Sequence, residues 1–252
     1  IIGMYLLVAG LSPEQWSNPG GWLRVLSPMH FLRTCLAMRL DLLVLCVLAV
    51  ALPWYIGVTV RSDGEWTRGF FLDHNLGRAV TAMEDHGGPP VYYVGALMVG
   101  FFPWSIFFIP FLLDLVRCCR SEHPYADRRL LVICWVCVVV GGFTLASTKL
   151  PSYITPCYPA LAVLMGNFLH RLSRGTARIG LFWPHVSYSV LGLVGLSIAI
   201  AIPVVGTQFV PGIEWLGSVG VVLVIGSLVA AVCWWRDMPM RSIQVTLVTS
   251  VA

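Results

Sequence analysis

Charged side chains are scarce in this sequence. Only 11% of its 252 residues are Asp, Glu, Lys or Arg, against about 25% in soluble domains. Hydrophobic residues make up 58% of the chain and the mean hydropathy is +0.81. A soluble globular domain is therefore excluded, and the composition predicts an all-α, polytopic membrane protein.

Lysine is nearly absent, because Lys149 is the single lysine of the chain. The net charge of +4 therefore comes from arginines. These arginines lie between the apolar runs, as expected for residues that fix membrane orientation. Binding to nucleic acid is not supported.

Long apolar runs are abundant, and hydropathy predicts six full transmembrane spans. A single helix over residues 130–169 would be about 60 Å long, twice the apolar thickness of a bilayer, so two spans with a turn at Lys149–Pro151 are expected there. The six spans are Leu40–Val60, Val91–Val116, Leu130–Ser147, Ser152–Leu169, Leu181–Val205 and Leu216–Trp235.

The seven connections carry, in order, 3, 3, 4, 1, 3, 0 and 2 basic residues. After a first tie, this alternation places the arginine-rich connections in the cytoplasm. Residues 61–90, 148–151 and 206–215 are then expected outside, in a multi-pass protein of the cell (inner) membrane. Residues 12–39 mix arginines with Trp, Leu and Phe, as in a segment lying in the cytoplasmic interface, with Pro28 interrupting it.

An initial methionine and a basic leader are both absent. The chain opens on Ile1, and residues 1–11 and 243–252 are each about half a span. We therefore expect residues 1–252 to be a transmembrane fragment of one membrane domain, with partial spans at both ends.

Cysteine is absent from the predicted outer loops, so a disulfide framework is not expected. Cys134 and Cys137 form a CxxC motif in the middle of a predicted span. With no second pair, ordinary helix packing is favoured over metal or redox chemistry.

The outer loop 61–90 is the most polar segment. Its ordinary interpretation is a solvated loop. Alternatively, its carboxylates and imidazoles bind a divalent cation or a phosphate at the interface, with an arginine adding a bidentate contact to an anion. The residues concerned are Asp73, His74, Asn75, Arg78, Glu84, Asp85 and His86.

Lys149 lies at the outer end of a predicted span. Its ammonium either snorkels into the headgroup layer or pairs with a lipid phosphate. Tyr153 follows four residues later, so in a helical turn the two side chains would share a face.

At these positions the sequence resembles the ArnT-like and protein-mannosyltransferase-like membrane glycosyltransferases. Five segments between Leu52 and Pro159 carry the resemblance, in the order that the family shows. They are Leu52-Pro-Trp-Tyr55, Gly69-Phe-Phe-Leu-Asp-His-Asn-Leu-Gly-Arg78, His86-Gly-Gly-Pro-Pro-Val-Tyr-Tyr93, Gly100-Phe-Phe-Pro-Trp-Ser105 and Lys149-Leu-Pro-Ser-Tyr-Ile-Thr-Pro156.

The resemblance implies a GT-C fold with its site on the outer face of the membrane. Such enzymes move a sugar from a polyprenyl-phosphate donor to an acceptor lipid, glycan or protein, with inversion. The family's catalytic Asp lies in a first outer loop that would precede this chain, so the catalytic residue is unknown here and the fragment is expected to be inactive alone. Candidates for a base by proximity alone are Asp63, Glu65, Glu84 and Asp85.

The resemblance also implies roles for individual residues. His74 resembles the histidine of the family's Glu-His motif, which binds a metal or the donor phosphate, although Asp73 replaces the usual Glu. Lys149 and Tyr153 resemble the Lys-Leu-Pro-x-Tyr element near the lipid phosphate. The other positions that match are Arg78, His86 and Tyr93.

Two other classes of function stay open. A transporter or lipid flippase would have ionisable residues in mid-span and broken helices in an inverted repeat, and the predicted spans show almost none of these. A non-catalytic membrane fragment is the third possibility.

Overall fold

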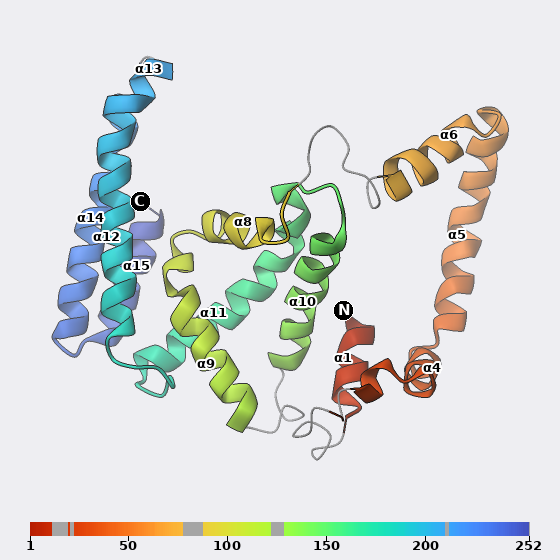
Figure 1. The fold of residues 1–252 in the computed structure, drawn as a ribbon, viewed down its shortest axis with the longest axis horizontal. Helices are drawn as coiled ribbons and strands as arrows, with labels where there is room; N and C mark the ends of the chain where they lie inside the picture. The colour runs from red at the N-terminus through yellow and green to blue at the C-terminus, as the bar shows by residue number, and fades with distance from the viewer. Residues whose placement is uncertain (12–19, 21–22, 78–87, 122–128, 210–211, 252) are drawn as a thin grey trace. The chain divides into compact units, whose positions relative to one another are not determined.

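The computed structural model describes residues 1–11, 20, 23–77, 88–121, 129–209 and 212–251, and every regular element in these ranges is a helix. The chain forms two compact units. Residues 1–96 and 123–161 make up the first unit, and residues 97–122 and 162–252 the second. In Figure 1 the helices are coloured from red at the N-terminus to blue at the C-terminus.

The first unit contains the helices before the predicted outer loop and those around Lys149. Helices α8 and α11 begin in this unit and continue into the second. Its elements are α1 (Ile2–Ala9), η1 (Leu23–Leu26), α4 (Pro28–Ala37), α5 (Leu40–Arg61), α6 (Glu65–Arg68), η2 (Gly69–Gly77), α8 (Tyr92–Gly100), α10 (Arg129–Leu145), η5 (Pro151–Cys157) and the start of α11 (Tyr158–Ser173).

The second unit contains the two longest apolar helices after α5. Its elements are η3 (Trp104–Phe107), α9 (Phe108–Ser121), the rest of α11, α12 (Trp183–Ala201), η6 (Ile202–Gly206), α13 (Thr207–Phe209), η7 (Glu214–Leu216), α14 (Gly217–Trp235) and α15 (Pro239–Val251).

Three stretches of the described chain are helical, apolar and long enough to cross a bilayer: Leu40–Arg61, Trp183–Gly206 and Glu214–Trp235, with 22, 24 and 22 residues. They coincide with the first, fifth and sixth predicted spans. Helices α10 and α11 have 17 and 16 residues and fall short of that length. The protein is thus a multi-pass helical membrane protein, and the count of six spans stays a prediction.

The span predicted over Val91–Val116 is broken in the structure. The chain bends by 119° between Tyr92–Gly100 and Trp104–Cys119. Pro103 lies at this break, and proline removes a backbone N–H while it disfavours helical geometry in the residue before it. Hydropathy cannot detect such a bend because the helices on both sides of it are apolar.

Helix α1 packs against α10 in the first unit. Val8, Leu130 and Cys134 are buried together, with Tyr5 and Ala9 at their edge. Cys134 therefore occupies a packing position. Helix α4 begins at Pro28, so this proline starts a helix and does not interrupt one. His30 Nε2 lies 2.8 Å from the Leu7 carbonyl oxygen and ties α4 to α1.

The first part of the predicted outer loop is helical and aromatic. Thr59 and Thr67 share a hydrogen bond of 2.5 Å between their hydroxyls, which fastens α6 to the end of α5. Trp66 stacks on Phe70 with centroids 5.0 Å apart and meets Trp54 edge-on at 5.1 Å. Aromatic clusters of this kind are typical of the boundary between bilayer and water.

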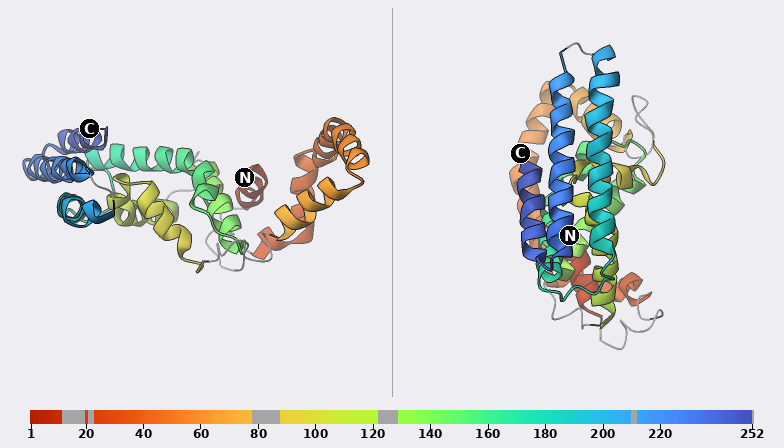
Figure 2. Two further views of the ribbon diagram at one scale, coloured as in Figure 1. Left: turned by 90° about the horizontal axis from the view of Figure 1, so that it is seen from above. Right: turned by 90° about the vertical axis from the view of Figure 1, so that its left-hand side faces the viewer.

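Helices α12, α14 and α15 lie side by side in the second unit (Figures 1 and 2). The crossing of α12 and α14 depends on glycine. A Cβ added at Gly220 would lie 2.3 Å from the Ala199 nitrogen, and one at Gly195 would lie 2.8 Å from the Gly220 oxygen. Small residues let membrane helices approach this closely.

A buried ion pair joins the middle of α9 to the last turn of α11. Asp114 is 3% exposed, and its Oδ1 accepts hydrogen bonds from Arg171 Nη2 at 3.3 Å and from the Arg178 backbone N–H at 2.6 Å. Arg171 Nη1 also donates to Cys118 Sγ at 2.6 Å. This cluster secures the connection after α11 to α9.

Candidate functional site

The break between α10 and α11 creates the candidate site. Helix α10 ends at Leu145, and η5 begins at Pro151. Leu150 is extended, with φ −126° and ψ 140°, as expected for a residue before proline. The predicted interruption of the 130–169 stretch at Lys149–Pro151 is confirmed, and it leaves several carbonyls at the end of α10 without helical partners.

Lys149 turns back to these carbonyls. Its Nζ donates to Thr144 O at 2.8 Å and to Ala146 O at 3.0 Å, and the residue is 6% exposed. The positive charge at the C-terminal end of α10 also complements the helix dipole. Lys149 is therefore buried against the end of α10, and its two expected placements, in the headgroup layer or on a lipid phosphate, stay predictions.

Tyr93 and Gly88, which are far from Lys149 in the sequence, complete the surroundings of its side chain. Its Nζ lies 5.7 Å from the centre of the Tyr93 ring, within the range of a cation–π contact. Its Cδ would lie 3.2 Å from a Cβ added at Gly88. Gly88 is thus a packing residue that sequence reasoning missed, although Gly87-Gly88-Pro89-Pro90 signals a tight backbone approach.

The Tyr93 hydroxyl is buried without a hydrogen-bond partner among the described residues. The residue is 1% exposed, and the Leu150 backbone lies near enough to interact electrostatically with the hydroxyl without forming a hydrogen bond of good geometry. An unpaired buried hydroxyl costs roughly 1–3 kcal/mol. A ligand oxygen reaching this hydroxyl would remove that cost.

Tyr153 reaches the site differently from the prediction. Because Leu150 is extended, the turn from Lys149 to Tyr153 is not helical, and the expected shared helical face is wrong. Tyr153 instead packs on Phe143 of α10 with centroids 5.0 Å apart. It lies close enough to Tyr93 for the two phenols to interact electrostatically.

The remaining predicted site residues are placed less fully. Arg78 and His86 lie outside the described residues, as do Glu84 and Asp85. The backbone of His74 lies in η2, next to the exposed Asp73. In the described part of the chain, no three side chains of His, Cys, Asp or Glu are grouped so as to hold a metal ion.

The electrostatics of the site favour an anion. Among the described residues, Lys149 pairs with carbonyl oxygens and an aromatic face, and no carboxylate forms a salt bridge with it. A buried cation without a counter-ion is costly and attracts negative charge. Lys149 and Tyr93 together offer an ammonium and a free hydroxyl to one ligand.

These features define a multi-pass helical membrane protein with a buried lysine and a buried tyrosine at a helix break. Comparison with known proteins finds that this chain is similar to ArnT transferases. The chain is 33% identical over 129 residues to an undecaprenyl phosphate-alpha-4-amino-4-deoxy-L-arabinose arabinosyl transferase of Pectobacterium carotovorum, covering 50% of this chain and 22% of that protein. Against the Serratia proteamaculans transferase of the same name it is 29% identical over 199 residues, covering 76% and 34%.

Solved structures agree on the fold. The crystal structure of ArnT from Cupriavidus metallidurans bound to undecaprenyl phosphate matches with a TM-score of 0.59 and 22% identity, over 100% of this chain and 43% of that one. No family model matches the sequence. The chain thus spans between about a fifth and a third of the length of the transferases named above, and the expected GT-C-like fold is confirmed.

Proposed function

We propose that the protein containing this chain is a glycosyltransferase that moves a sugar from a polyprenyl-phosphate donor to an acceptor at the outer face of the cell membrane. The observation that carries the proposal is the buried ammonium of Lys149, which lacks a carboxylate partner among the described residues and faces Tyr93 with its unpaired hydroxyl. The names of the relatives, and the ligand in the Cupriavidus structure, point to undecaprenyl phosphate as the carrier.

The chemistry of such a transfer suits these groups. The donor loses its sugar from a phosphate, so negative charge develops on the phosphate oxygens as the bond breaks. A pre-positioned cation and hydroxyl stabilise that charge more in the transition state than in the ground state. The polyprenyl tail would hold the phosphate at the bilayer surface, where the helix break is expected to lie.

We assign the donor phosphate to Lys149 and Tyr93, with Tyr153 beside them. Arg78 and His86 are proposed for the same phosphate on the family resemblance. The base that activates the acceptor is left to the part of the family fold that precedes the matched segments. The acceptor, whether lipid, glycan or protein, stays unassigned.

Replacing Lys149 tests the proposal. Lys149→Met keeps much of the apolar stem and removes the charge. If the ammonium contacts the phosphate, donor turnover by the full-length enzyme should fall by about 10- to 150-fold, the equivalent of roughly 1.5–3 kcal/mol for a hydrogen bond to a charged group. The assay is sugar transfer at subsaturating donor, with the amount of folded protein matched.

The matched control is Ser152→Ala, an exposed position in the same turn. It should transfer at the wild-type rate. A cap that only holds the end of α10 would lower the melting temperature of Lys149→Met without changing transfer per folded molecule. Wild-type transfer per folded molecule would therefore refute the phosphate contact.

We also propose that His74 assists the donor, either as a ligand of a divalent cation or by contacting the phosphate. Its support is the resemblance of Phe71-Leu-Asp-His-Asn75 to the family's histidine motif. Imidazole and carboxylate groups are usual ligands of divalent metals. His74→Ala should remove most transfer, and a chelator should do the same if a metal takes part.

The control for His74 is Leu76→Ala, an exposed residue of the same helix. If chelation leaves transfer unchanged while His74→Ala abolishes it, the metal role is wrong and phosphate binding stands. A fully active His74→Ala enzyme would contradict both roles.

A transporter is less well supported by the described residues. The bend between α8 and α9 is one feature that broken transporter helices share. However, Lys149 lies beyond the end of α10, and Asp114, in the middle of α9, is paired with Arg171. In the three long apolar helices of the described chain, no charged residue is buried, although transport usually requires such residues in mid-helix.

A further inference from the structure

Helix α15 is amphipathic in the opposite sense to a helix in water. Its polar residues Ser242 and Thr246 are 0% and 1% exposed and face the protein. Its apolar residues Leu247 and Val248 are 54% and 65% exposed. Ser242 Oγ donates to the Tyr188 hydroxyl at 2.7 Å, so the polar stripe holds α15 to α12. The outer face of α15 is therefore suited to lipid.

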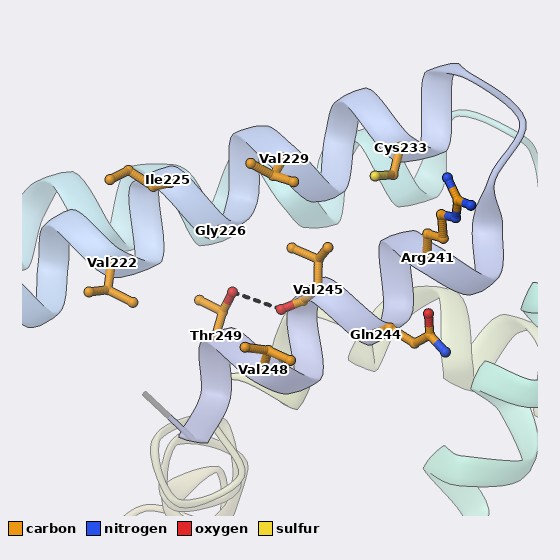
Figure 3. A pocket seen from close by; sticks show the side chains of 10 residues that line it. All are labelled: Val222, Ile225, Gly226, Val229, Cys233, Arg241, Gln244, Val245, Val248 and Thr249. Carbon is orange, nitrogen blue, oxygen red and sulfur yellow. Dashed lines mark hydrogen bonds between the residues drawn. The ribbon is translucent and has the colours of Figure 1, made fainter.

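A groove of about 610 Å³ runs between α14 and α15 on this face. Figure 3 shows its walls, which include four valine side chains, two from each helix. The two backbones meet where Thr249 packs against Gly226, since a Cβ there would overlap the Thr249 side chain.

The length of the groove corresponds to one leaflet. Its lining on α14 extends from Val222 to Cys233. Eleven helical steps span about 16 Å, roughly half of an apolar bilayer core of about 30 Å. A hydrocarbon chain from one leaflet would fill such a groove, whereas a partner helix that crosses the bilayer would extend past it.

One end of the groove is cationic. Figure 3 shows Arg241 at the end where Cys233 lies, with the amide of Gln244 on the same helix. The Arg241 guanidinium makes one hydrogen bond, to Met238 Sδ at 3.3 Å, and no carboxylate forms a salt bridge with it among the described residues. Sulfur is a weak acceptor, so this guanidinium keeps donors for an anion.

From the apolar walls, the one-leaflet length and the cationic end, we infer that the groove binds an anionic glycerophospholipid. One acyl chain lies along Val229 and Val245, and the headgroup phosphate accepts hydrogen bonds from Arg241. The distribution of arginines predicts that this end faces the cytoplasm, where anionic lipids attract basic side chains.

Native mass spectrometry of the purified full-length protein tests this inference. The probes are phosphatidylglycerol and phosphatidylcholine with the same acyl chains. We expect phosphatidylglycerol to bind more tightly. Arg241→Gln should lower its affinity by about fivefold, the effect of one basic side chain near anionic lipid, and leave phosphatidylcholine unchanged. Val229→Trp, which fills the groove, should weaken both lipids.

Two matched controls accompany these variants. Leu228→Trp adds the same bulk at the neighbouring exposed position outside the groove, and Arg174→Gln removes an exposed arginine elsewhere. Both should bind lipid like the wild type. Thermal unfolding of each variant identifies any that fails to fold, in which case Val248→Trp and Arg241→Met replace it.

Other outcomes would overturn the inference. Unchanged binding of phosphatidylglycerol to Val229→Trp would show that the groove does not hold the lipid. Equal affinities for the two lipids, or no effect of Arg241→Gln, would contradict the headgroup assignment. A dimer that Val229→Trp dissociates would mean that a second copy occupies the groove.

Discussion

Lys149 and Tyr93 at the candidate site differ in how their polar groups are paired. The ammonium of Lys149 satisfies two carbonyls of α10, and the hydroxyl of Tyr93 satisfies none among the described residues. Both are almost fully buried. A polar group that is buried without a partner is usually explained by a ligand, a water or a catalytic role. A substitution at Tyr93 therefore distinguishes an effect on stability from an effect on function more clearly than a substitution at Lys149 does.

Tyr93→Phe is expected to have opposite effects on stability and on transfer. Removing a buried hydroxyl without a partner should leave the free energy of unfolding of the ligand-free protein unchanged, or raise it by up to about 1 kcal/mol. If the hydroxyl donates to the donor phosphate, the KM for the donor should rise by about tenfold. Thermal unfolding and steady-state transfer kinetics measure the two effects.

The neighbouring Tyr92→Phe serves as the control, because Tyr92 is partly exposed and meets Tyr93 edge-on. It should leave the donor KM unchanged. A Tyr93→Phe protein that loses stability, with an unaltered KM, would show that the hydroxyl has a structural partner and no substrate.

Among the helices, α12 and α14 pack so closely that their backbones touch. At the crossing of α12 and α14, Gly195 and Gly220 leave no room for a methyl group. In α10, by contrast, a Cβ at Gly141 would meet nothing within 4 Å. Gly220 and Gly141 are thus both helical glycines, but only Gly141 has room for a larger side chain.

Gly220→Ala should destabilise the second unit. Its methyl group would push α12 from α14, at a cost of about 1–3 kcal/mol for overpacking. Gly141→Ala is the control, and it should be neutral or stabilising by about 0.5–1 kcal/mol because alanine favours helix. Thermal unfolding in detergent measures both. Equal melting temperatures for the two variants would argue against the close crossing.

At the scale of the whole molecule, the arginine distribution predicts the orientation in the membrane. Ser62 follows α5 at the start of the predicted outer loop, and Ser173 ends α11 beside three arginines of the predicted cytoplasmic side. The charge rule places these two positions on opposite sides of the membrane.

Cysteines introduced at Ser62 and Ser173, in a background without the native cysteines, should therefore differ in reactivity. On intact cells, or on spheroplasts where an outer membrane is present, a thiol reagent that cannot cross the membrane should label position 62 and spare position 173. After permeabilisation both should react. Equal labelling before permeabilisation would disprove the orientation.

Hydropathy predicted some elements closely. The first span was expected at Leu40–Val60 and α5 is Leu40–Arg61. The break near Lys149–Pro151 was also predictable, because one helix there would be twice the thickness of a bilayer. The bend at Pro103 was not, since an apolar run has the same hydropathy whether it is straight or folded back.

The site was predictable in composition and less so in geometry. Lys149 and Tyr93 were selected from sequence, and the structure places the ammonium 5.7 Å from the ring centre. Their contact joins segments 56 residues apart, and no local periodicity encodes it. The unpaired state of the Tyr93 hydroxyl depends on every neighbour at once, so only coordinates reveal it.

The pairing of Asp114 with Arg171 also constrains the order in which the chain can be assembled. The two residues are 57 positions apart, so at a synthesis rate of about 5–20 residues per second Arg171 is made roughly 3–11 s after Asp114. During that interval the Asp114 carboxylate lacks its Arg171 partner. The packing of α9 around this carboxylate can therefore be completed only after α11 has been synthesised.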